Sequence, residues 1–166
     1  MDISFYINSD IIFDPKATAV PYNYRISYKI ALICAIIGKC CGKKGCSAIK
    51  LQMINAATIS QKVKAELFSL ISNPFVMETT IIRFDPAISR AINLALADEI
   101  IYRQSNGLYR LKDKGKKLVD LIYEDDTVMM VEKQLLTELS NKLTEGIIDC
   151  IADNWRVEES VKNKQN

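Results

Sequence analysis

The chain has 166 residues and a net charge of +2, with 49% hydrophobic and 25% charged residues. This composition is ordinary for a globular domain, so disorder of the whole chain is excluded. The longest uncharged apolar run, 30–37, has 8 residues, far short of the roughly 20 that a membrane-spanning helix needs. The chain has no histidine, which removes Ser-His-Asp and Cys-His triads and the commonest zinc ligand.

The N-terminal half of the chain predicts helices. After an irregular segment, with a candidate edge strand at 11–13, an apolar helix is expected at about 25–39 and should form the centre of the core. A turn rich in glycine and lysine follows it. Ser47 can cap a second helix at about 48–58. A third helix is expected at about 60–72, where Asn73-Pro74 ends it.

The middle of the chain predicts a helix that leads into a β-hairpin. A short strand is expected at 81–84, and Asp85-Pro86 then starts a helix that runs to about Glu99. Asn106-Gly107 separates two β-prone runs, 100–104 and 108–111, which is the strongest short-range signal for a hairpin.

Two further helices are expected after the hairpin. Lys112 stands where a threonine often caps the helix behind such a hairpin, so Asp113 is expected to cap a helix at about 114–124. One long helix is then expected at about 128–156, with Gly146 weakening its centre. It carries an apolar stripe expected to bind a partner protein, made of Leu136, Leu139, Leu143, Ile147, Ile151 and Trp155. The alternative is that this stripe packs on the chain's own core.

The order of these elements predicts a mainly α fold with a small β-hairpin. Helices, a helix that runs directly into a hairpin, and a further helix are typical of a winged helix-turn-helix core, here followed by a long C-terminal helix. The predicted organisation is an irregular segment at 1–24, a winged-helix domain at 25–125, a C-terminal helix at 126–156 and a flexible tail at 157–166.

The predicted wing is strongly basic. Residues 101–117 contain six Lys or Arg against a single acid, Asp113, and could meet DNA phosphates. Arg90 and Asn93 lie one turn apart on the preceding helix and could pair with bases, whereas Asp98 and Glu99 would repel phosphate. Sequence-specific contact, non-specific contact and a merely solvated surface all stay open. The candidate DNA-binding residues are Arg90, Asn93, Arg103, Arg110, Lys112, Lys114, Lys116 and Lys117.

Charge is unevenly distributed along the chain. Residues 1–117 hold 17 Lys or Arg against 9 Asp or Glu, whereas 118–166 hold 5 against 11. A basic body and an acidic C-terminal part suggest two different partners. Ordinary solvated helix faces are the alternative.

Catalytic and metal chemistry finds little support. The five cysteines include Cys40, Cys41 and Cys46, but no C-x-x-C pair exists. Reduced thiols in a cytoplasmic protein without a signal peptide are the main expectation, with a metal site or a redox role for the vicinal pair as alternatives. We therefore expect no catalytic residues, no metal and no cofactor.

Three segments together resemble a known bacterial family. They are the apolar helix after Pro21-Tyr22-Asn23-Tyr24-Arg25, the Asp85-Pro86 helix with Arg90-Ala91-Ile92-Asn93, and the wing with Asn106-Gly107, Tyr109, Leu111 and Gly115. In these features the chain resembles the middle components of bacterial ABC three-component systems, in particular the small winged-helix subunits of Lamassu-type anti-phage complexes. The resemblance covers about 20–125 and includes no catalytic signature.

The resemblance implies a function without enzymatic activity. Such a subunit would bind an SMC/Rad50-like ATPase and an effector nuclease, and would hold the nuclease inactive until foreign DNA ends are sensed. From the residues themselves, the basic wing could contact double-stranded DNA non-specifically, and a cytoplasmic location without a membrane partner is expected. The alternative is a winged-helix transcriptional regulator, which would need a symmetric dimer on spaced half-sites.

Overall fold

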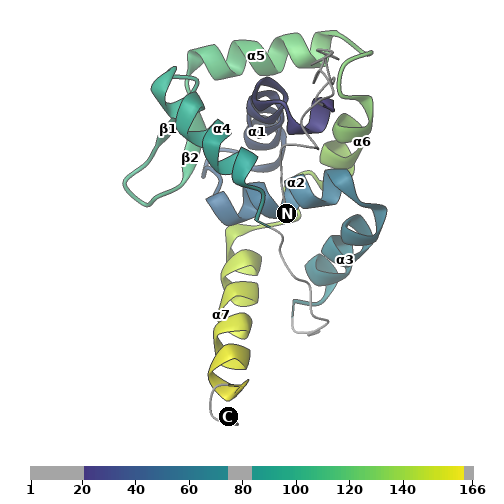
Figure 1. Ribbon diagram of the computed structural model, residues 1–166, viewed down its shortest axis with the longest axis vertical. Coiled ribbons are helices and arrows are strands. Elements are labelled where there is room, and N and C mark those ends of the chain that lie inside the picture. The colour runs from purple at the N-terminus through teal and green to yellow at the C-terminus, as the bar shows by residue number, and fades with distance from the viewer. Residues whose placement is uncertain (1–20, 75–83, 163–166) are drawn as a thin grey trace, which may run out of the picture.

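The computed structural model in Figure 1 is mainly helical. It describes residues 21–74 and 84–162, with side chains up to Asp153. One antiparallel two-stranded sheet is present in these ranges, so the prediction of a mainly α fold with a small β-hairpin is confirmed. The elements are η2 (Tyr22–Tyr24), α1 (Ile26–Cys40), α2 (Ala48–Ile59), α3 (Gln61–Ser72), α4 (Pro86–Ala97), β1 (Ile101–Arg103), β2 (Tyr109–Leu111), α5 (Asp113–Glu124), α6 (Met130–Leu139) and α7 (Glu145–Lys162).

Helix α1 is the centre of the core, as its apolar sequence predicts. It contacts α2, α4, α5, α6 and β2, which surround it in Figure 1. A helix that is apolar on most of its faces is stable in water only when other elements cover those faces. The side chains of 32–37 are accordingly all buried.

The helices predicted from caps are present near the expected residues. The Ser47 hydroxyl accepts a hydrogen bond from the Lys50 N–H at 3.1 Å, which starts α2. Helix α3 ends at Ser72, directly before Asn73-Pro74. The strand expected at 11–13 lies outside the described residues, as do the first three residues of the one expected at 81–84. Phe84, the last of these, is not in a strand.

Helix α4 begins at Pro86 and runs directly into the hairpin. The Asp85 carboxylate accepts a hydrogen bond from the Ala87 N–H at 2.9 Å, as expected of a cap. The helix ends at Ala97, two residues before the expected end, because Glu99 adopts a left-handed conformation (φ 56°). The Glu99 and Ile100 N–H groups donate to the carbonyls of Leu96 and Ala95, which is a Schellman ending.

The hairpin forms around Asn106-Gly107 as predicted. Strands β1 and β2 pair with Ile101 opposite Leu111 and Arg103 opposite Tyr109. Gly107 has φ 83°, a conformation that glycine adopts without strain. An isolated bridge joins Tyr109 to Cys46, so the segment before α2 lies alongside β2.

The predicted cap of α5 is wrong by one residue. Lys112 occupies the N-cap position without a capping side chain, and Asp113 is already the first helical residue. The Asp113 carboxylate instead accepts from the Lys116 ammonium at 3.0 Å. A carboxylate in the first turn still faces the positive end of the helix dipole, so Asp113 favours the helix without capping it.

The single long helix expected at 128–156 is also wrong. The chain forms α6 and α7, separated by a break at 140–144. Ser140 has φ 44° and ψ −133°, which no helix allows, and the Thr144 hydroxyl accepts from the Ile147 N–H at 3.3 Å to start α7. The break lets Leu139 and Leu143 both reach the core, where each is 0% exposed. Burial of both leucines therefore prevails over helix continuity.

The predicted partner stripe is largely interior as a result. Leu136, Leu139 and Leu143 are completely buried and Ile151 is 3% exposed, so in this fold the four side chains expected to face a partner pack on the chain's own core, which was the alternative. Ile147 is partly buried against the same core. The Trp155 side chain lies outside the described residues. None of the described helices is long and apolar enough to cross a membrane.

Candidate nucleic-acid interface

The hairpin has an inner and an outer face, which follow from its register. Ile101 and its cross-strand partner Leu111 pack toward the core. Tyr102 and Arg110 form the next pair, and because successive side chains in a strand alternate, they lie on the opposite face. This outer face continues into the first turn of α5.

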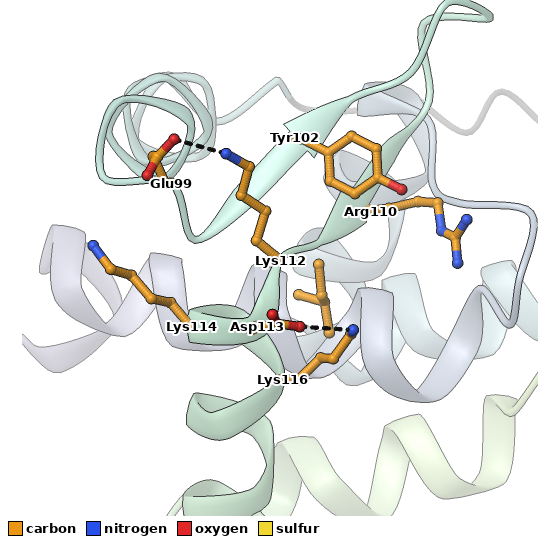
Figure 2. A pocket seen from close by; sticks show the side chains of 8 residues that line it. Glu99, Tyr102, Arg110, Lys112, Asp113, Lys114 and Lys116 are labelled. Carbon is orange, nitrogen blue, oxygen red and sulfur yellow. Dashed lines mark hydrogen bonds and ion pairs between the residues drawn. The ribbon is translucent and has the colours of Figure 1, made fainter.

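A hollow of about 400 Å³ lies on this outer face. Four of the predicted DNA-binding side chains line it together with two carboxylates, which leaves a local charge of +2 (Figure 2). The Tyr102 ring forms part of the same wall. The charged residues are Arg110, Lys112, Lys114, Lys116, Glu99 and Asp113. The structure therefore gathers half of the predicted DNA-binding residues at one place.

Three of the four cations have a partner among the residues that the structure describes. The Lys112 ammonium lies 2.8 Å from Glu99 Oε1, and the Lys116 ammonium 3.0 Å from Asp113 Oδ1. The Lys114 ammonium donates to the Asp98 carbonyl at 3.1 Å. Hydrogen bonds from the two lysines to these carboxylates lower the pKa of Glu99 and of Asp113. Both ion pairs are solvent-exposed and can exchange partners with a bound phosphate.

The other four predicted residues lie outside the hollow. Arg90 and Asn93 are exposed on α4, and Lys117 is exposed on α5. Arg103 lies beside the hairpin turn, where its guanidinium comes close to Gly107. Arg90, Arg103, Arg110 and Lys117 form no ion pair with any residue in the described ranges.

The structure adds a basic loop that the sequence analysis did not assign to the interface. Lys43 and Lys44 are exposed in the turn before α2. The Gln104 side chain donates to the Lys44 carbonyl at 2.9 Å, and Cys46 exchanges two backbone hydrogen bonds with Tyr109. This loop therefore lies against the hairpin. Its lysines and glycines predicted a turn, but nothing local to them indicated the contact with residues sixty positions later.

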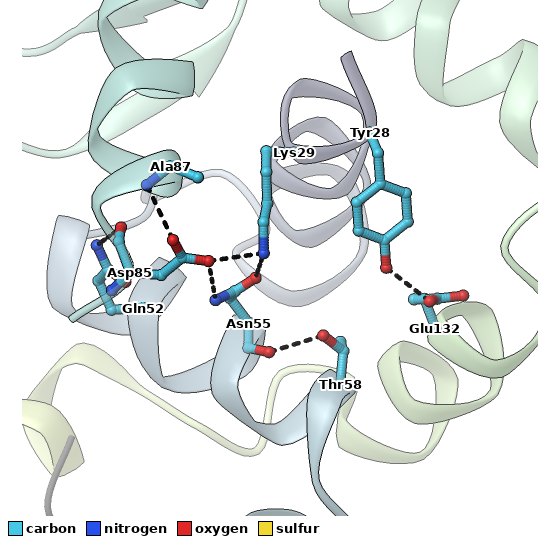
Figure 3. Close-up of polar contacts among 8 residues, drawn as sticks. All are labelled: Tyr28, Lys29, Gln52, Asn55, Thr58, Asp85, Ala87 and Glu132. Atoms are coloured by element: carbon cyan, nitrogen blue, oxygen red, sulfur yellow. Dashed lines mark hydrogen bonds and ion pairs between the residues drawn. The ribbon is translucent and has the colours of Figure 1, made fainter. Parts of the chain in front are cut away.

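A buried polar cluster is the second feature that the sequence analysis missed (Figure 3). The Lys29 ammonium, on a side chain 1% exposed, lies 2.8 Å from Asp85 Oδ2 and donates to Asn55 Oδ1 at 2.6 Å. Gln52 binds the Asp85 backbone through both its amide atoms, at 2.9 and 3.2 Å. Together these bonds tie α1 and α2 to the start of α4.

The chemistry of this cluster points to a structural role. Burial raises the pKa of Asp85, but hydrogen bonds from Lys29, Ala87 and Asn55 outweigh it and hold the pKa of Asp85 below its usual value. Lys29 and Asp85 thus compensate each other's charge at the junction of α1, α2 and α4. A group of three or more metal-binding side chains is absent from the described part of the chain.

Comparison with known proteins assigns no family. No family model, no curated protein and no solved structure matches the chain.

Proposed function

We propose that the chain is a non-enzymatic winged-helix subunit that binds double-stranded DNA non-specifically through its wing, within an SMC-like ATPase complex that also contains an effector nuclease. The observation that carries the DNA contact is the hollow lined by Arg110, Lys112, Lys114 and Lys116. Phosphate contacts made by lysine and arginine supply most of the affinity in non-specific DNA binding. The ATPase and the nuclease follow from the resemblance alone.

The arrangement of elements supports the winged-helix part of this proposal. Helix α4 leads into β1 and β2, and α5 follows the hairpin directly. The bridge between Cys46 and Tyr109 gives β2 a second neighbour, contributed by the segment between α1 and α2. A hairpin held beside a helix in this way presents both to the same macromolecule.

Helix α4 is poorly suited to reading bases, which favours non-specific contact over a sequence-specific regulator. Its exposed face includes Leu94, 47% exposed, beside Arg90 and Asn93. Asp98 and Glu99 are exposed at its C-terminal end and would repel phosphate. Base readout in the major groove usually relies on several polar side chains along such a helix.

Helix α7 is the element that we propose for the partner protein. Its first part contacts α2 and buries Ile148 and Ile151, whereas its distal part extends away from the body in Figure 1. The proposed partner surface is therefore the distal part of α7, in place of the stripe that begins at Leu136. Deleting 154–166 should abolish co-purification with the proposed SMC-like ATPase, with circular dichroism as the control that the truncated chain still folds.

The DNA contact is tested by the salt dependence of binding to a duplex of random sequence. In the variant with Arg110→Ala and Lys114→Ala, the plot of log affinity against log salt should become shallower. Its negative slope should shrink in magnitude by about two, one unit for each lost contact. A matched variant with Lys62→Ala and Lys142→Ala removes the same charge from exposed positions outside the hollow and should keep the slope. Equal slopes for both variants would show that the hollow does not bind DNA. Tight binding of one sequence by a dimer would favour the regulator.

A further inference from the structure

A second hollow, the α7 hollow, has a volume of about 650 Å³ and lies between the basic loop 42–45 and the start of α7. It shares no lining residue with the hollow beside the wing. Sites for small molecules usually have volumes of about 300 to 1,000 Å³, so the α7 hollow is large enough for an organic ligand. Its wall combines apolar side chains, such as Leu143, with several charged ones.

The two cysteines of this wall are occupied by the backbone. The thiols of Cys40 and Cys41 donate to the carbonyls of Leu136 and Ile36, each 3.6 Å away. The vicinal pair considered for a redox role therefore has its two thiols directed at different carbonyls. The chemistry of the hollow is left to its charged side chains.

The basic loop is fixed against the hairpin. Gly42 and Gly45 have positive φ, 53° and 101°, which allows the tight reversal. A Cβ atom on Gly45 would lie 2.5 Å from the Gln104 side-chain nitrogen and 3.0 Å from the Tyr109 carbonyl, so no larger residue fits there. The exposed lysines 43 and 44 line the hollow from this loop.

Lys50 adds a buried positive charge to the wall. It is 3% exposed and forms no ion pair with any residue in the described ranges. Its ammonium donates to the Cys40 carbonyl at 2.8 Å, which uses one of its three donors. Lys29, which is as deeply buried, has the Asp85 carboxylate at 2.8 Å. A buried charge without a counter-ion is costly, so an anion that enters the α7 hollow can supply what Lys50 lacks.

The charges that line the hollow favour an anion. Three lysines stand against one carboxylate, Glu145, which leaves a local charge of +2 among the described lining residues. Glu145 Oε1 accepts a hydrogen bond from the Ser47 N–H at 3.1 Å, so this carboxylate is held by the start of α2. It lies beyond ion-pair distance of all three lysines.

The first turn of α7 adds two backbone donors. The Thr144 hydroxyl accepts from the Ile147 N–H at 3.3 Å, whereas the N–H groups of Glu145 and Gly146 have no partner among the described residues. Gly146 lines the hollow. Free N–H groups at a helix N-terminus attract anions, so they reinforce the effect of the lysines.

We propose that the α7 hollow binds the phosphate group of a small phosphorylated molecule, with Lys50 as its buried counter-ion and Lys43 and Lys44 at the rim. A phosphate group carries about two negative charges and several acceptor oxygens, which match this lining. A DNA duplex resting on the surface could meet the exposed Lys43 and Lys44 but not Lys50, so a small ligand fits the hollow better. This site does not depend on the proposed DNA function.

Calorimetric titration of the full-length chain with inorganic phosphate, at constant ionic strength, tests the site. We expect saturable binding of one phosphate per chain. Lys43→Ala with Lys44→Ala should weaken it about tenfold or more, because two charged donors are lost. Glu145→Gln keeps an acceptor for the Ser47 N–H but removes the carboxylate, so it should tighten binding. A wild type that shows no saturable binding at millimolar phosphate, or a Glu145→Gln variant that binds more weakly, would overturn the proposal.

Lys50→Met tests the buried charge, since it keeps the length of the side chain. It should abolish phosphate binding while circular dichroism shows an intact fold. Unchanged affinity in this variant would contradict the role of Lys50. If the variant does not fold, the lysine pair of the loop and Glu145→Gln decide.

Two further measurements separate this site from the wing. Arg110→Ala with Lys114→Ala should keep the affinity for inorganic phosphate, and loss of binding in this variant alone would place the phosphate beside the wing and refute the α7 hollow. A random duplex should not displace phosphate from the wild type at constant ionic strength. Displacement would show that the hollow takes a DNA phosphate, which would overturn the assignment of a small ligand.

Discussion

Two lysine–carboxylate pairs of this chain have the same length and opposite surroundings. Lys29 and Asp85 lie 2.8 Å apart with side chains 1% and 20% exposed, and Lys112 and Glu99 lie 2.8 Å apart with side chains 42% and 66% exposed. Distance alone therefore does not reveal what a pair does. The Lys29 ammonium is shut off from solvent and depends on Asp85 for its counter-charge, whereas the exposed charges of Lys112 and Glu99 can leave each other for a phosphate.

The buried pair fixes how the core helices meet. Lys29 on α1 reaches Asp85 at the start of α4 and Asn55 on α2, so one ammonium joins three elements. An unpaired buried charge is costly, so these helices have to keep the arrangement in which the pair forms. The wing then takes its position from α4, since the hairpin begins four residues after that helix ends.

Removing only the charge of Asp85 should give the largest loss of stability. Asp85→Asn keeps a side chain that can cap α4 but leaves the Lys29 ammonium buried without its counter-ion. We expect the free energy of unfolding, measured by urea denaturation, to fall by about 3 kcal/mol. Lys29→Met combined with Asp85→Asn should recover much of that loss. If Asp85→Asn alone changes stability no more than the exposed Glu99→Gln does, the buried pair does not organise the core.

Truncating a buried leucine in the break between α6 and α7 should give the next largest loss of stability. Leu143 is 0% exposed, although a continuous helix would have left it free to bind a partner. Leu143→Ala should lower the free energy of unfolding by about 2 to 4 kcal/mol because it leaves a cavity. Leu121→Ala is the matched control, since Leu121 is 63% exposed. Equal effects of the two variants would favour the continuous helix.

Acid should weaken the buried pair in a defined direction. The pKa of Asp85 is lower in the folded chain than in the unfolded one, so its contribution is complete above the unfolded pKa of about 3.9 and is lost as the pH falls through the folded pKa. Stability measured from pH 6 to pH 2 should therefore decline more steeply for the wild type than for the double variant. The difference in slope is at most about 1.4 kcal/mol per pH unit. Parallel curves would contradict a lowered pKa.

Whether two residues are close together or far apart in the sequence explains which features of the fold could be predicted. Asp85-Pro86, Asn106-Gly107 and Ser47 act on their immediate neighbours, so the start of α4, the hairpin and the cap of α2 followed from short patterns. Lys29 and Asp85 are far apart in the sequence, and only the packing of α1 against α4 brings them together.

Local patterns also misled where packing prevailed. The apolar spacing from Leu136 to Ile151 suits one helix, yet Ser140 turns the chain so that the leucines on both sides are buried. The Ser140-Asn141 pair and the cap at Thr144 were the available signals for this break. Of the proposed interface, the basic residues of the hairpin and α5 were predictable from composition, whereas the carboxylates that partly neutralise them were not assigned as their partners.

Breaking the exposed pair of Lys112 and Glu99 should have the smallest effect of these changes, and it should act on DNA binding alone. Glu99→Gln frees the Lys112 ammonium from its carboxylate partner without disturbing the core, since both side chains are solvent-exposed. The hollow then gains one positive charge, so affinity for a random duplex at low salt should rise by a few-fold and the salt slope should steepen by up to about one unit. Glu66→Gln on α3, which removes the carboxylate partner of the exposed Lys62, should leave DNA affinity unchanged. If Glu99→Gln leaves both the affinity and the salt slope unchanged, or weakens binding, then Lys112 does not contact a DNA phosphate.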